Sequence, residues 1–374
     1  MLIVADDKIP FLKGVLESCA DVVYLPGGEI GPKDLREADG LIVRTRTRVD
    51  AGLLSGSRVK AVVSATIGTD HMDIPWLEEN GIAWANALGC NSGSVKQYVA
   101  SVFAALEKGY YPLAGKTLGV VGVGNVGRKV AQVGEAFGMK VLLNDPPRQE
   151  SEPDFPGLDL NVLLQLSDVV SFHVPLLHSG KYPTYHLLND TTLMMMKRGS
   201  VLINSSRGEV VDERVMKKGI SSGIIDLGIL DVWEHEPDID RDLQRRLMLG
   251  TPHIAGYSVD GKANGTTAAV RFISSQFGLG LDDWSPAELP VFDDMTITPD
   301  APGLSLNQQI ASAVLGTYDV REDAERLTAH PENFELLRGN YPIRREFPAW
   351  RVHASEKPAQ LIRSLELLGF NTAG

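Results

Sequence analysis

The chain has 374 residues, of which 43% are apolar and 22% are charged. This length predicts two or three domains, and the composition excludes a disordered or collagen-like chain. The 36 basic and 48 acidic residues give a net charge of −12, which argues against nucleic-acid binding. No apolar run is long enough to span a membrane, and the acidic N-terminus does not resemble a signal peptide. Because the chain has only two cysteines, we expect a cytoplasmic protein with reduced thiols. From its charge and its lack of a long apolar run, we expect it to bind neither nucleic acid nor membrane.

Short β-branched runs alternate with helical stretches, which predicts parallel βα units. The first series of expected strands covers residues 2–5, 22–25, 40–44 and 61–64. A long helix is expected over residues 92–108. The second series covers residues 117–121, 140–144, 169–173, 200–204 and 224–230. Two separate series predict two α/β domains side by side.

The composition of the sequence changes near residue 285, where prolines become frequent. Four prolines, at positions 286, 290, 299 and 302, mark a linker or domain boundary. The residues beyond it predict a mixed module, with a strand over 350–354 and a helix over 359–368. We expect this module to carry a dimer contact, and its deletion to leave a folded, monomeric α/β core.

A glycine-rich turn directly follows one of the expected strands. Gly122, Gly124 and Gly127, with Asn125 and Val126 between them, form a G-x-G-x-x-G pattern that leads into a predicted helix. In this context the first glycine permits a tight turn, the second lets the backbone approach a pyrophosphate, and the third lets the helix pack closely. The helix N-terminus would supply N–H donors to the anion. The pattern predicts a dinucleotide site.

An acidic residue follows at the end of the next expected strand. Asp145 lies eighteen residues beyond Gly127. A carboxylate at this point accepts hydrogen bonds from the ribose 2′-hydroxyl and repels a 2′-phosphate. Asp145 therefore favours NAD over NADP as cofactor, although the nearby Arg148 weakens this preference.

Three residues near the ends of later strands suit the oxidation of a 2-hydroxy acid. Arg207 and Glu236 each follow an expected strand, and His253 lies on a short loop. Ligands of open α/β sheets bind beyond the carboxyl ends of the strands. His253 would take the hydroxyl proton, because the pKa of histidine lies near neutrality. Glu236 would orient and tune this base, and Arg207 would hold the substrate carboxylate.

The other histidines are weaker candidates for the base. His186 lies in a loop with no acid or arginine arrayed around it in the sequence. His235 adjoins Glu236 but would point to the opposite side if this segment is extended. His71 and Glu234 are the next candidates if His253 is not the base.

A second anion site is indicated by alternating arginines after the third expected strand. In an extended chain Arg44, Arg46 and Arg48 would share one face. Three converging cations need solvent or a bound anion between them, and a phosphate would suit this charge. Thr66 follows the next strand and would lie beside them. The alternative is a solvated loop, and which arginines would bind a phosphate stays open.

These motifs resemble the D-isomer-specific 2-hydroxyacid dehydrogenases, whose arginine, glutamate and histidine follow the glycine-rich turn in this order. Finer features resemble one branch of that family and extend the likeness over essentially the whole chain. They are residues 89–91, 145–148, 252–257, 260–263 and 341–347. That branch oxidises 4-phospho-D-erythronate to (R)-3-hydroxy-2-oxo-4-phosphobutanoate in pyridoxine 5′-phosphate (vitamin B6) biosynthesis.

The resemblance implies a domain organisation. We expect an α/β protein with two Rossmann-like doubly wound parallel-sheet domains, a cleft between them, and a small α+β C-terminal dimerisation domain. The substrate-binding (lid) domain would be discontinuous, over residues 1–92 and 256–284. The NAD-binding domain would cover residues 93–255, and the C-terminal domain residues 285–374 would form a homodimer.

The resemblance also implies roles for individual residues. Arg207 and Glu236 would be catalytic, and His253 would be the proton donor and acceptor. Besides the glycine-rich turn, the residues near NAD would be Asp145, Val174, Ser206, Asp231 and Gly256. The residues near the phosphorylated 2-hydroxy acid would be Arg44, Thr45, Thr66 and Tyr257. No metal ligand is expected, and Val174 can contact the cofactor only through its backbone.

Two alternatives remain at this point. Residues 44–46 are equally typical of phosphoglycerate dehydrogenase, but the C-terminal module lacks the βαββαβ pattern of an amino-acid-binding regulatory domain. The second alternative is a non-catalytic, NAD-sensing corepressor-like scaffold. The intact arginine, glutamate and histidine argue against it.

Overall fold

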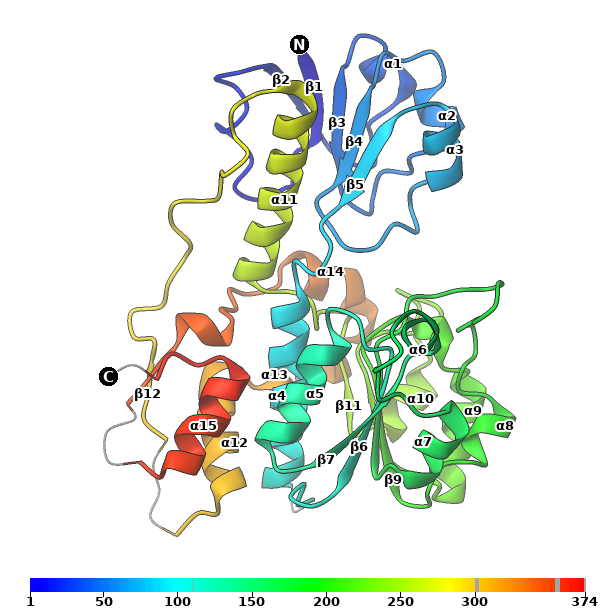
Figure 1. The fold of residues 1–374 in the computed structure, drawn as a ribbon, viewed down its shortest axis with the longest axis vertical. Helices are drawn as coiled ribbons and strands as arrows, with labels where there is room; N and C mark the ends of the chain where they lie inside the picture. Colours follow the sequence, from blue (N-terminus) through cyan, green and yellow to red (C-terminus); the bar gives the residue numbers. More distant parts are fainter. Residues whose placement is uncertain (110, 300–302, 354–356, 373–374) are drawn as a thin grey trace. The chain divides into compact units, whose positions relative to one another are not determined.

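The computed structural model describes residues 1–109, 111–299, 303–353 and 357–372. The chain forms two compact units (Figure 1). The first unit comprises Met1–Asn91 and Ser258–Val291, and the second comprises Ser92–Tyr257 and Phe292–Gly374.

The first unit is built on a five-stranded parallel sheet with the order β2-β1-β3-β4-β5. Its strands are β1 (Leu2–Asp6), β2 (Asp21–Leu25), β3 (Gly40–Val43), β4 (Ala61–Ser64) and β5 (Ala83–Asn86). Its helices are α1 (Pro32–Leu35), α2 (Ala51–Leu54), α3 (Ile74–Glu79) and α11 (Val259–Phe277). The four predicted strands are confirmed. The edge strand β5 was not predicted, because its half-buried sequence lacks β-branched residues.

Apolar side chains cover both faces of this sheet, as expected for parallel strands. On one face the strands pack against α1, α2 and α3 through Leu35, Leu54 and Leu77. On the other face they pack against α11 through Val270 and Ile273.

The second unit is built on a six-stranded parallel sheet with the order β11-β10-β9-β8-β6-β7. Its strands are β6 (Thr117–Val121), β7 (Lys140–Asn144), β8 (Val169–Phe172), β9 (Ser200–Asn204), β10 (Ile225–Leu230) and β11 (Leu249–Gly250). Its helices up to the sheet's last strand are α4 (Ser92–Lys108), α5 (Gly127–Ala136), α6 (Pro146–Ser151), α7 (Leu160–Leu166), α8 (Asp190–Leu193), α9 (Glu213–Ser222) and α10 (Arg241–Arg246). All five predicted strands of the second series are confirmed, and the two-residue β11 was not predicted.

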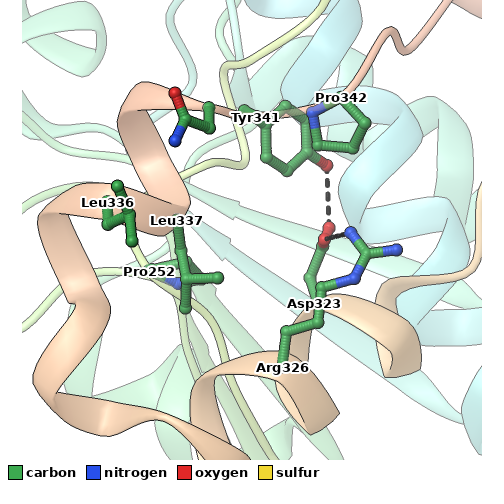
Figure 2. A pocket seen from close by; sticks show the side chains of 8 residues that line it. Pro252, Asp323, Arg326, Leu336, Leu337, Tyr341 and Pro342 are labelled. Carbon is green, nitrogen blue, oxygen red and sulfur yellow. Dashed lines mark hydrogen bonds and ion pairs between the residues drawn. The ribbon is translucent and has the colours of Figure 1, made fainter.

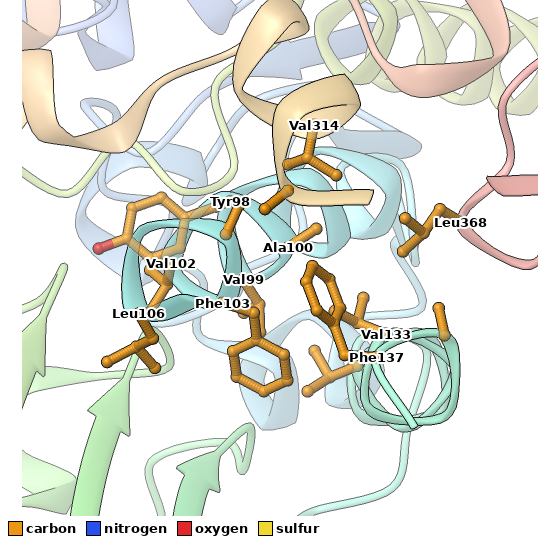
Figure 3. Close-up of a cluster of buried hydrophobic side chains, with 14 of the residues drawn as sticks. Tyr98, Val99, Ala100, Val102, Phe103, Leu106, Val133, Phe137, Val314 and Leu368 are labelled. Atoms are coloured by element: carbon orange, nitrogen blue, oxygen red, sulfur yellow. The ribbon is translucent and has the colours of Figure 1, made fainter. Parts of the chain in front are cut away.

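Helix α4 lies at the centre of this unit and has the predicted bounds. Almost every side chain along it is buried, so it is not a simple amphipathic surface helix. Phe103 meets Phe137 at the end of α5 in an edge-to-face contact with ring centroids 5.8 Å apart. Val314 and Leu368 from the C-terminal segment belong to the same core (Figure 3).

The C-terminal segment packs into the second unit. Its elements are β12 (Thr296–Ile297), α12 (Leu306–Thr317), α13 (Val320–Ala329), α14 (Phe334–Gly339), β13 (Arg351–Val352) and α15 (Ala359–Leu368). Within the described part of the chain, short 3₁₀ helices cover Gly208–Val210, Pro331–Asn333 and Phe347–Ala349. The predicted helix over 359–368 is confirmed. The predicted strand over 350–354 is limited to β13, which pairs with β12, and its expected last residue lies outside the described residues.

The six-stranded sheet changes its winding direction at β6. This strand has β7 on one side and β8 on the other, so the loop after β6 lies at the topological switch point where open α/β sheets bind ligands. Among the described residues, no helix is both long enough and apolar enough to cross a membrane.

Candidate active site

The glycine-rich turn lies at this switch point. Gly122 follows β6 directly with a φ of +86°, a conformation that L side chains rarely adopt. A Cβ here would lie 2.7 Å from the carbonyl oxygen of His173 and 2.8 Å from Cγ1 of Val174. At Gly127 a Cβ would collide with the carbonyl oxygen of Gly122. Packing within the protein therefore requires glycine at both positions.

Gly124 has a different reason to be glycine. Apart from Gly124 itself and its two chain neighbours, no described residue has a heavy atom within 4 Å of the place where its Cβ would be, and both it and Asn125 are exposed. Helix α5 starts at Gly127, and the preceding Val126 offers no side-chain hydrogen bond to its first N–H groups. The turn thus fits a pyrophosphate that approaches the backbone closely at Gly124 and meets the helix N-terminus.

Asp145 lies at the end of β7 and is tied to this turn. Its Oδ2 accepts a hydrogen bond from the Val123 N–H at 2.8 Å. Its Oδ1 accepts one from the Arg148 N–H at 3.2 Å, which caps α6. This carboxylate is therefore fixed beside the glycine-rich turn, as a ribose-binding acid must be.

The side chain of Arg148 is engaged elsewhere. Its guanidinium donates hydrogen bonds to both carboxylate oxygens of Glu152, at 2.8 and 2.5 Å, and to the carbonyl oxygen of Val123 at 2.9 Å. It also lies over the ring of Phe155, 4.3 Å from the centroid. Because Glu152 neutralises Arg148, this arginine does little to weaken the preference for NAD that Asp145 indicates.

Arg207 follows β9 in a loop held by side-chain hydrogen bonds. Asn204 Oδ1 accepts hydrogen bonds from the N–H and the hydroxyl of Ser206, at 3.1 and 2.7 Å. The Asn204 amide donates to the carbonyl oxygen of Arg207 at 2.9 Å. A Cβ at Gly208 would collide with the backbone of Trp233, so this loop packs closely against the loop after β10. The backbone of Arg207 is thereby fixed at the carboxyl end of the sheet.

Glu236 and His253 form a hydrogen-bonded pair. The Nδ1 of His253 lies 2.7 Å from Glu236 Oε2, and Glu236 Oε1 accepts a hydrogen bond from the Trp233 N–H at 3.0 Å. Because the carboxylate occupies Nδ1, it selects the tautomer whose Nε2 can accept a proton. The sequence predicted both residues, and the structure brings them together although seventeen positions separate them.

Asp231 holds the loop that carries His253. It is buried, and its carboxylate accepts hydrogen bonds from the Thr251 hydroxyl at 2.7 Å and the N–H groups of Ile254 and Ala255 at 2.8 and 2.9 Å. Its carbonyl oxygen accepts the His253 N–H at 2.8 Å. His253 itself has a φ of +56°, which these bonds help to maintain. The residue predicted to lie near NAD therefore also positions the loop of the predicted base.

A second histidine–carboxylate pair corrects the expectation for His186. Its Nε2 lies 2.6 Å from Glu234 Oε1, and Asp212 is 4.0 Å from its Nδ1. The sequence concealed this pair because the two partners are 48 positions apart. The segment around His235 is a turn and not an extended chain, so the alternation argument does not apply there. Among the remaining histidines, burial lowers the pKa of His71 and lowers that of His173 to about 3.

The arginine-rich segment of the first unit differs from its predicted form. The Thr47 N–H donates to the Arg44 carbonyl oxygen at 3.2 Å, so the chain turns here and does not alternate as an extended strand. Arg44 donates two hydrogen bonds, both at 3.0 Å, to the buried carboxylate of Asp6 at the end of β1. Arg48 pairs with Asp50 at 2.9 Å. Two of the three arginines are therefore neutralised by acids of the protein.

The predicted substrate residues lie in both units. Thr45 is exposed beside Arg44, and the hydroxyl of Thr66 lies 2.8 Å from that of Ser64. Tyr257 belongs to the second unit, where its N–H donates to the Ile254 carbonyl oxygen at 2.8 Å in a turn that contains Gly256. No group of acidic, histidine or cysteine side chains among the described residues is arranged to hold a metal ion.

The sequence is similar to known proteins over nearly its full length. Residues 94–255 match the family model described as the D-isomer specific 2-hydroxyacid dehydrogenase, NAD binding domain, and residues 290–369 match a domain of unknown function. The chain is 44% identical over 356 residues to an erythronate-4-phosphate dehydrogenase of Bacteroides fragilis, covering 94% of this chain and 99% of that protein. It is 40% identical over 382 residues to one of Chromohalobacter salexigens, covering 99% and 98%.

The chain belongs to the erythronate-4-phosphate dehydrogenase family of D-isomer-specific 2-hydroxyacid dehydrogenases. It is an NAD-dependent oxidoreductase of that family. Its fold is also that of a crystal structure of NAD⁺-bound 3-phosphoglycerate dehydrogenase from Entamoeba histolytica, with a TM-score of 0.63 and 23% identity over 77% of this chain and 99% of the other.

One residue near the Glu236–His253 pair had no signal in the sequence. Arg338 of α14 lies 4.0 Å from Glu236 Oε2. About one hundred positions separate the two, and the arginine lies just before the resembling segment 341–347, so local pattern could not reveal the contact.

Proposed function

We propose that this dehydrogenase oxidises 4-phospho-D-erythronate to (R)-3-hydroxy-2-oxo-4-phosphobutanoate, as a step of vitamin B6 synthesis. The single observation that carries the chemistry is the Glu236–His253 hydrogen bond of 2.7 Å at the carboxyl end of a sheet with a dinucleotide-binding turn. The choice of substrate rests on relatives named erythronate-4-phosphate dehydrogenase, whose matches cover 94% and 99% of this chain.

His253 carries out the proton transfer. Its Nε2 accepts the proton of the substrate's C2 hydroxyl as the C–H bond breaks, and the imidazolium that forms is stabilised by Glu236 at Nδ1. When NAD⁺ is bound, it supplies the acceptor for the hydride that leaves C2. The substrate thus loses one hydride and one proton and becomes the 2-oxo acid.

Several side chains would orient the substrate. Arg207 holds the carboxylate, for which a guanidinium offers two parallel N–H donors and a charge that does not titrate. Thr45, Thr66 and the exposed edge of Arg44 would contact the phosphorylated end, and Tyr257 would contact the substrate from the second unit. Because Arg44 is paired with the carboxylate of Asp6, this segment offers a phosphate less net positive charge than the sequence alone suggested.

The domain roles follow the same proposal. Residues 93–255 bind NAD, residues 1–92 with 256–284 bind the substrate, and residues 285–374 form a homodimer. The enzyme would work in the cytoplasm, where its two cysteines stay reduced. Sedimentation at micromolar concentration should give the mass of a dimer.

A substrate screen tests the function. The purified full chain is mixed with NAD⁺ and with 4-phospho-D-erythronate, D-erythronate, 3-phosphoglycerate or D-lactate, and NADH is followed by absorbance, with the product also identified by mass. We expect 4-phospho-D-erythronate to give the highest kcat/KM. Faster turnover of 3-phosphoglycerate would replace the proposed substrate, and no turnover of any acid would contradict an enzymatic role.

A further inference from the structure

Arg338 brings a positive charge from the C-terminal segment to the catalytic pair. Its Nη1 lies 4.0 Å from Oε2 of Glu236. This oxygen is the one that lies 2.7 Å from Nδ1 of His253. One carboxylate oxygen is therefore shared between the imidazole and a guanidinium.

The side chain of Arg338 is held in a defined place. Its Nη1 lies 3.1 Å from Glu335 Oε1, and its guanidinium lies 5.9 Å from the ring centroids of both Tyr257 and Phe334. Only 20% of the side chain is exposed. Burial opposes its charge, yet Tyr257, Glu236 and Glu335 together raise the pKa of Arg338. The cation is thus permanent at all working pH values.

The segment that carries Arg338 is anchored against the loop of His253. Asp323 Oδ2 accepts hydrogen bonds from the hydroxyls of Tyr318 at 2.8 Å and Tyr341 at 2.7 Å, and Figure 2 shows the latter bond in a pocket that Pro252 also lines. The ring of Tyr341 packs edge-on against Tyr257, with centroids 5.8 Å apart.

A second arginine completes this anchorage. Arg344 is only 4% exposed, and its Nη2 donates a hydrogen bond of 2.7 Å to the carbonyl oxygen of Ala255. Its guanidinium lies 4.5 Å from the ring centroid of Tyr318. The C-terminal segment therefore contacts the active-site loop at Ala255 and Tyr257 and reaches Glu236 itself.

We propose that Arg338 is a positioning residue of the active site, which fixes the carboxylate of Glu236 and offsets part of the negative charge that this carboxylate presents to His253. The C-terminal segment would then contribute to catalysis and not only to assembly. This inference rests on the proposed function only for the identity of the substrate.

The sign of the effect follows from the charges around the pair. Glu236 favours the imidazolium form of His253, and a cation beside Glu236 opposes it. The other charged groups near Arg338 are Glu335 and the buried Asp231, and Arg344 reaches the same loop at Ala255. All of them are retained in Arg338→Gln. Removal of this one cation should therefore favour imidazolium and shift its titration to higher pH.

The test compares pH profiles of full-length variants. In Arg338→Gln we expect the acidic limb of the kcat/KM profile to move up by about half to one pH unit. The plateau kcat should fall by roughly three- to tenfold, because Glu236 loses one of its anchors, whereas KM should change less than about twofold. Arg338→Lys keeps the charge and should restore the position of the limb. The limb position does not depend on how much of the variant is folded.

A matched control removes the same charge elsewhere in the C-terminal segment. Arg363 on α15 is exposed, and Arg363→Gln should leave the limb in place. An unmoved limb in Arg338→Gln, or an equal movement in Arg363→Gln, would overturn the proposal. A raised KM with unchanged kcat would instead assign Arg338 to substrate binding, which also contradicts a positioning role.

A measurement without substrate separates this inference from the proposed function. The titration of His253 can be followed by NMR on histidine-labelled protein, with the signal assigned through His253→Gln. The titration midpoint should be higher in Arg338→Gln than in the wild type, whichever acid the enzyme oxidises. An unchanged midpoint contradicts the role of Arg338, whereas a failed substrate screen contradicts only the proposed function.

Discussion

At the scale of single residues, the candidate active site is organised by hydrogen bonds that engage its acidic side chains. Glu236 uses one oxygen for the Trp233 N–H and the other for His253. Asp231 is buried, and its carboxylate accepts hydrogen bonds from the loop that carries His253. Because the surrounding acids are engaged in this way, His253 Nε2 is the atom of the pair suited to exchange a proton with substrate.

His253→Ala and Arg207→Ala should reduce the activity by different amounts. His253→Ala should lower kcat on the order of 10²- to 10⁴-fold while NAD still binds. Arg207→Ala removes a charged hydrogen bond and should lower kcat/KM by about one to two decades, or more if the position of the carboxylate also sets the hydride geometry. Steady-state kinetics with NAD binding by calorimetry measure both. A near-active His253→Ala would exclude this active site.

Glu236→Gln should change the pH dependence more than the maximal rate. The substitution keeps the shape of the side chain but removes the charge that favours imidazolium, so the acidic limb of the pH–rate profile should move to lower pH. This direction is opposite to that expected for Arg338→Gln. A profile that stays in place would show that Glu236 does not act on the base, and His186 with Glu234 would be the next pair to test.

The choice between the two nicotinamide cofactors should depend on Asp145 and Glu152. NADP should bind far more weakly than NAD, because its 2′-phosphate would face the Asp145 carboxylate. Glu152→Gln releases Arg148 from its ion pair and should strengthen NADP binding by roughly three- to tenfold with little effect on NAD. Calorimetric titration of both cofactors provides the comparison. Equal affinities in the wild type would reverse the assignment.

At the scale of elements, the two sheets owe their form to buried β-branched strands with helices on both faces. The patterns of β6, β7 and β9 predicted their bounds, because short apolar runs rich in β-branched residues are typical of buried parallel strands. Strand β5 was missed because it lacks β-branched residues, and β11 was missed because two residues carry little pattern. Only pairing with β4 and β10 makes them strands.

Two glycines of the β6–α5 turn should respond differently to alanine. In Gly124→Ala the added methyl group would project into open space, so the melting temperature should stay within about 2 °C. The same methyl group would keep a pyrophosphate from the backbone, so NAD affinity should fall on the order of tenfold. Gly127→Ala collides with the Gly122 carbonyl oxygen and should destabilise the fold by about 1–3 kcal/mol. Thermal unfolding and NAD calorimetry on both variants test this. Normal NAD affinity in Gly124→Ala would show that the cofactor does not approach there.

At the scale of the whole molecule, the C-terminal segment is part of the second unit's core. Ile310, Val314, Leu361 and Leu365 are buried in the same apolar cluster as α4. Asn307 also donates hydrogen bonds to Glu107 at 2.8 Å and to the Phe137 carbonyl oxygen at 2.9 Å. These contacts explain why α4 is buried on nearly every side.

Deletion of residues 292–374 should therefore prevent folding, in contrast to the folded monomeric core expected from the sequence. The truncation would expose the apolar surface of α4 to water. We expect insoluble or aggregated protein by sedimentation, with loss of the cooperative unfolding transition that the full chain shows. A soluble truncated protein with a sharp melting transition would contradict this and restore the expectation from the sequence.

The sequence by itself determined the features that local pattern and chemistry encode. Strand periodicity predicted two parallel sheets, and the spacing of Gly122, Gly124 and Gly127 predicted the dinucleotide turn. The position of Glu236 after an expected strand and that of His253 on a short loop led to the roles predicted for them. The tertiary structure decided which side chains meet across long stretches of chain. It paired Arg44 with Asp6, His186 with Glu234 and Arg338 with Glu236. Such contacts leave no local trace, because burial and charge compensation depend on the neighbours that the fold supplies.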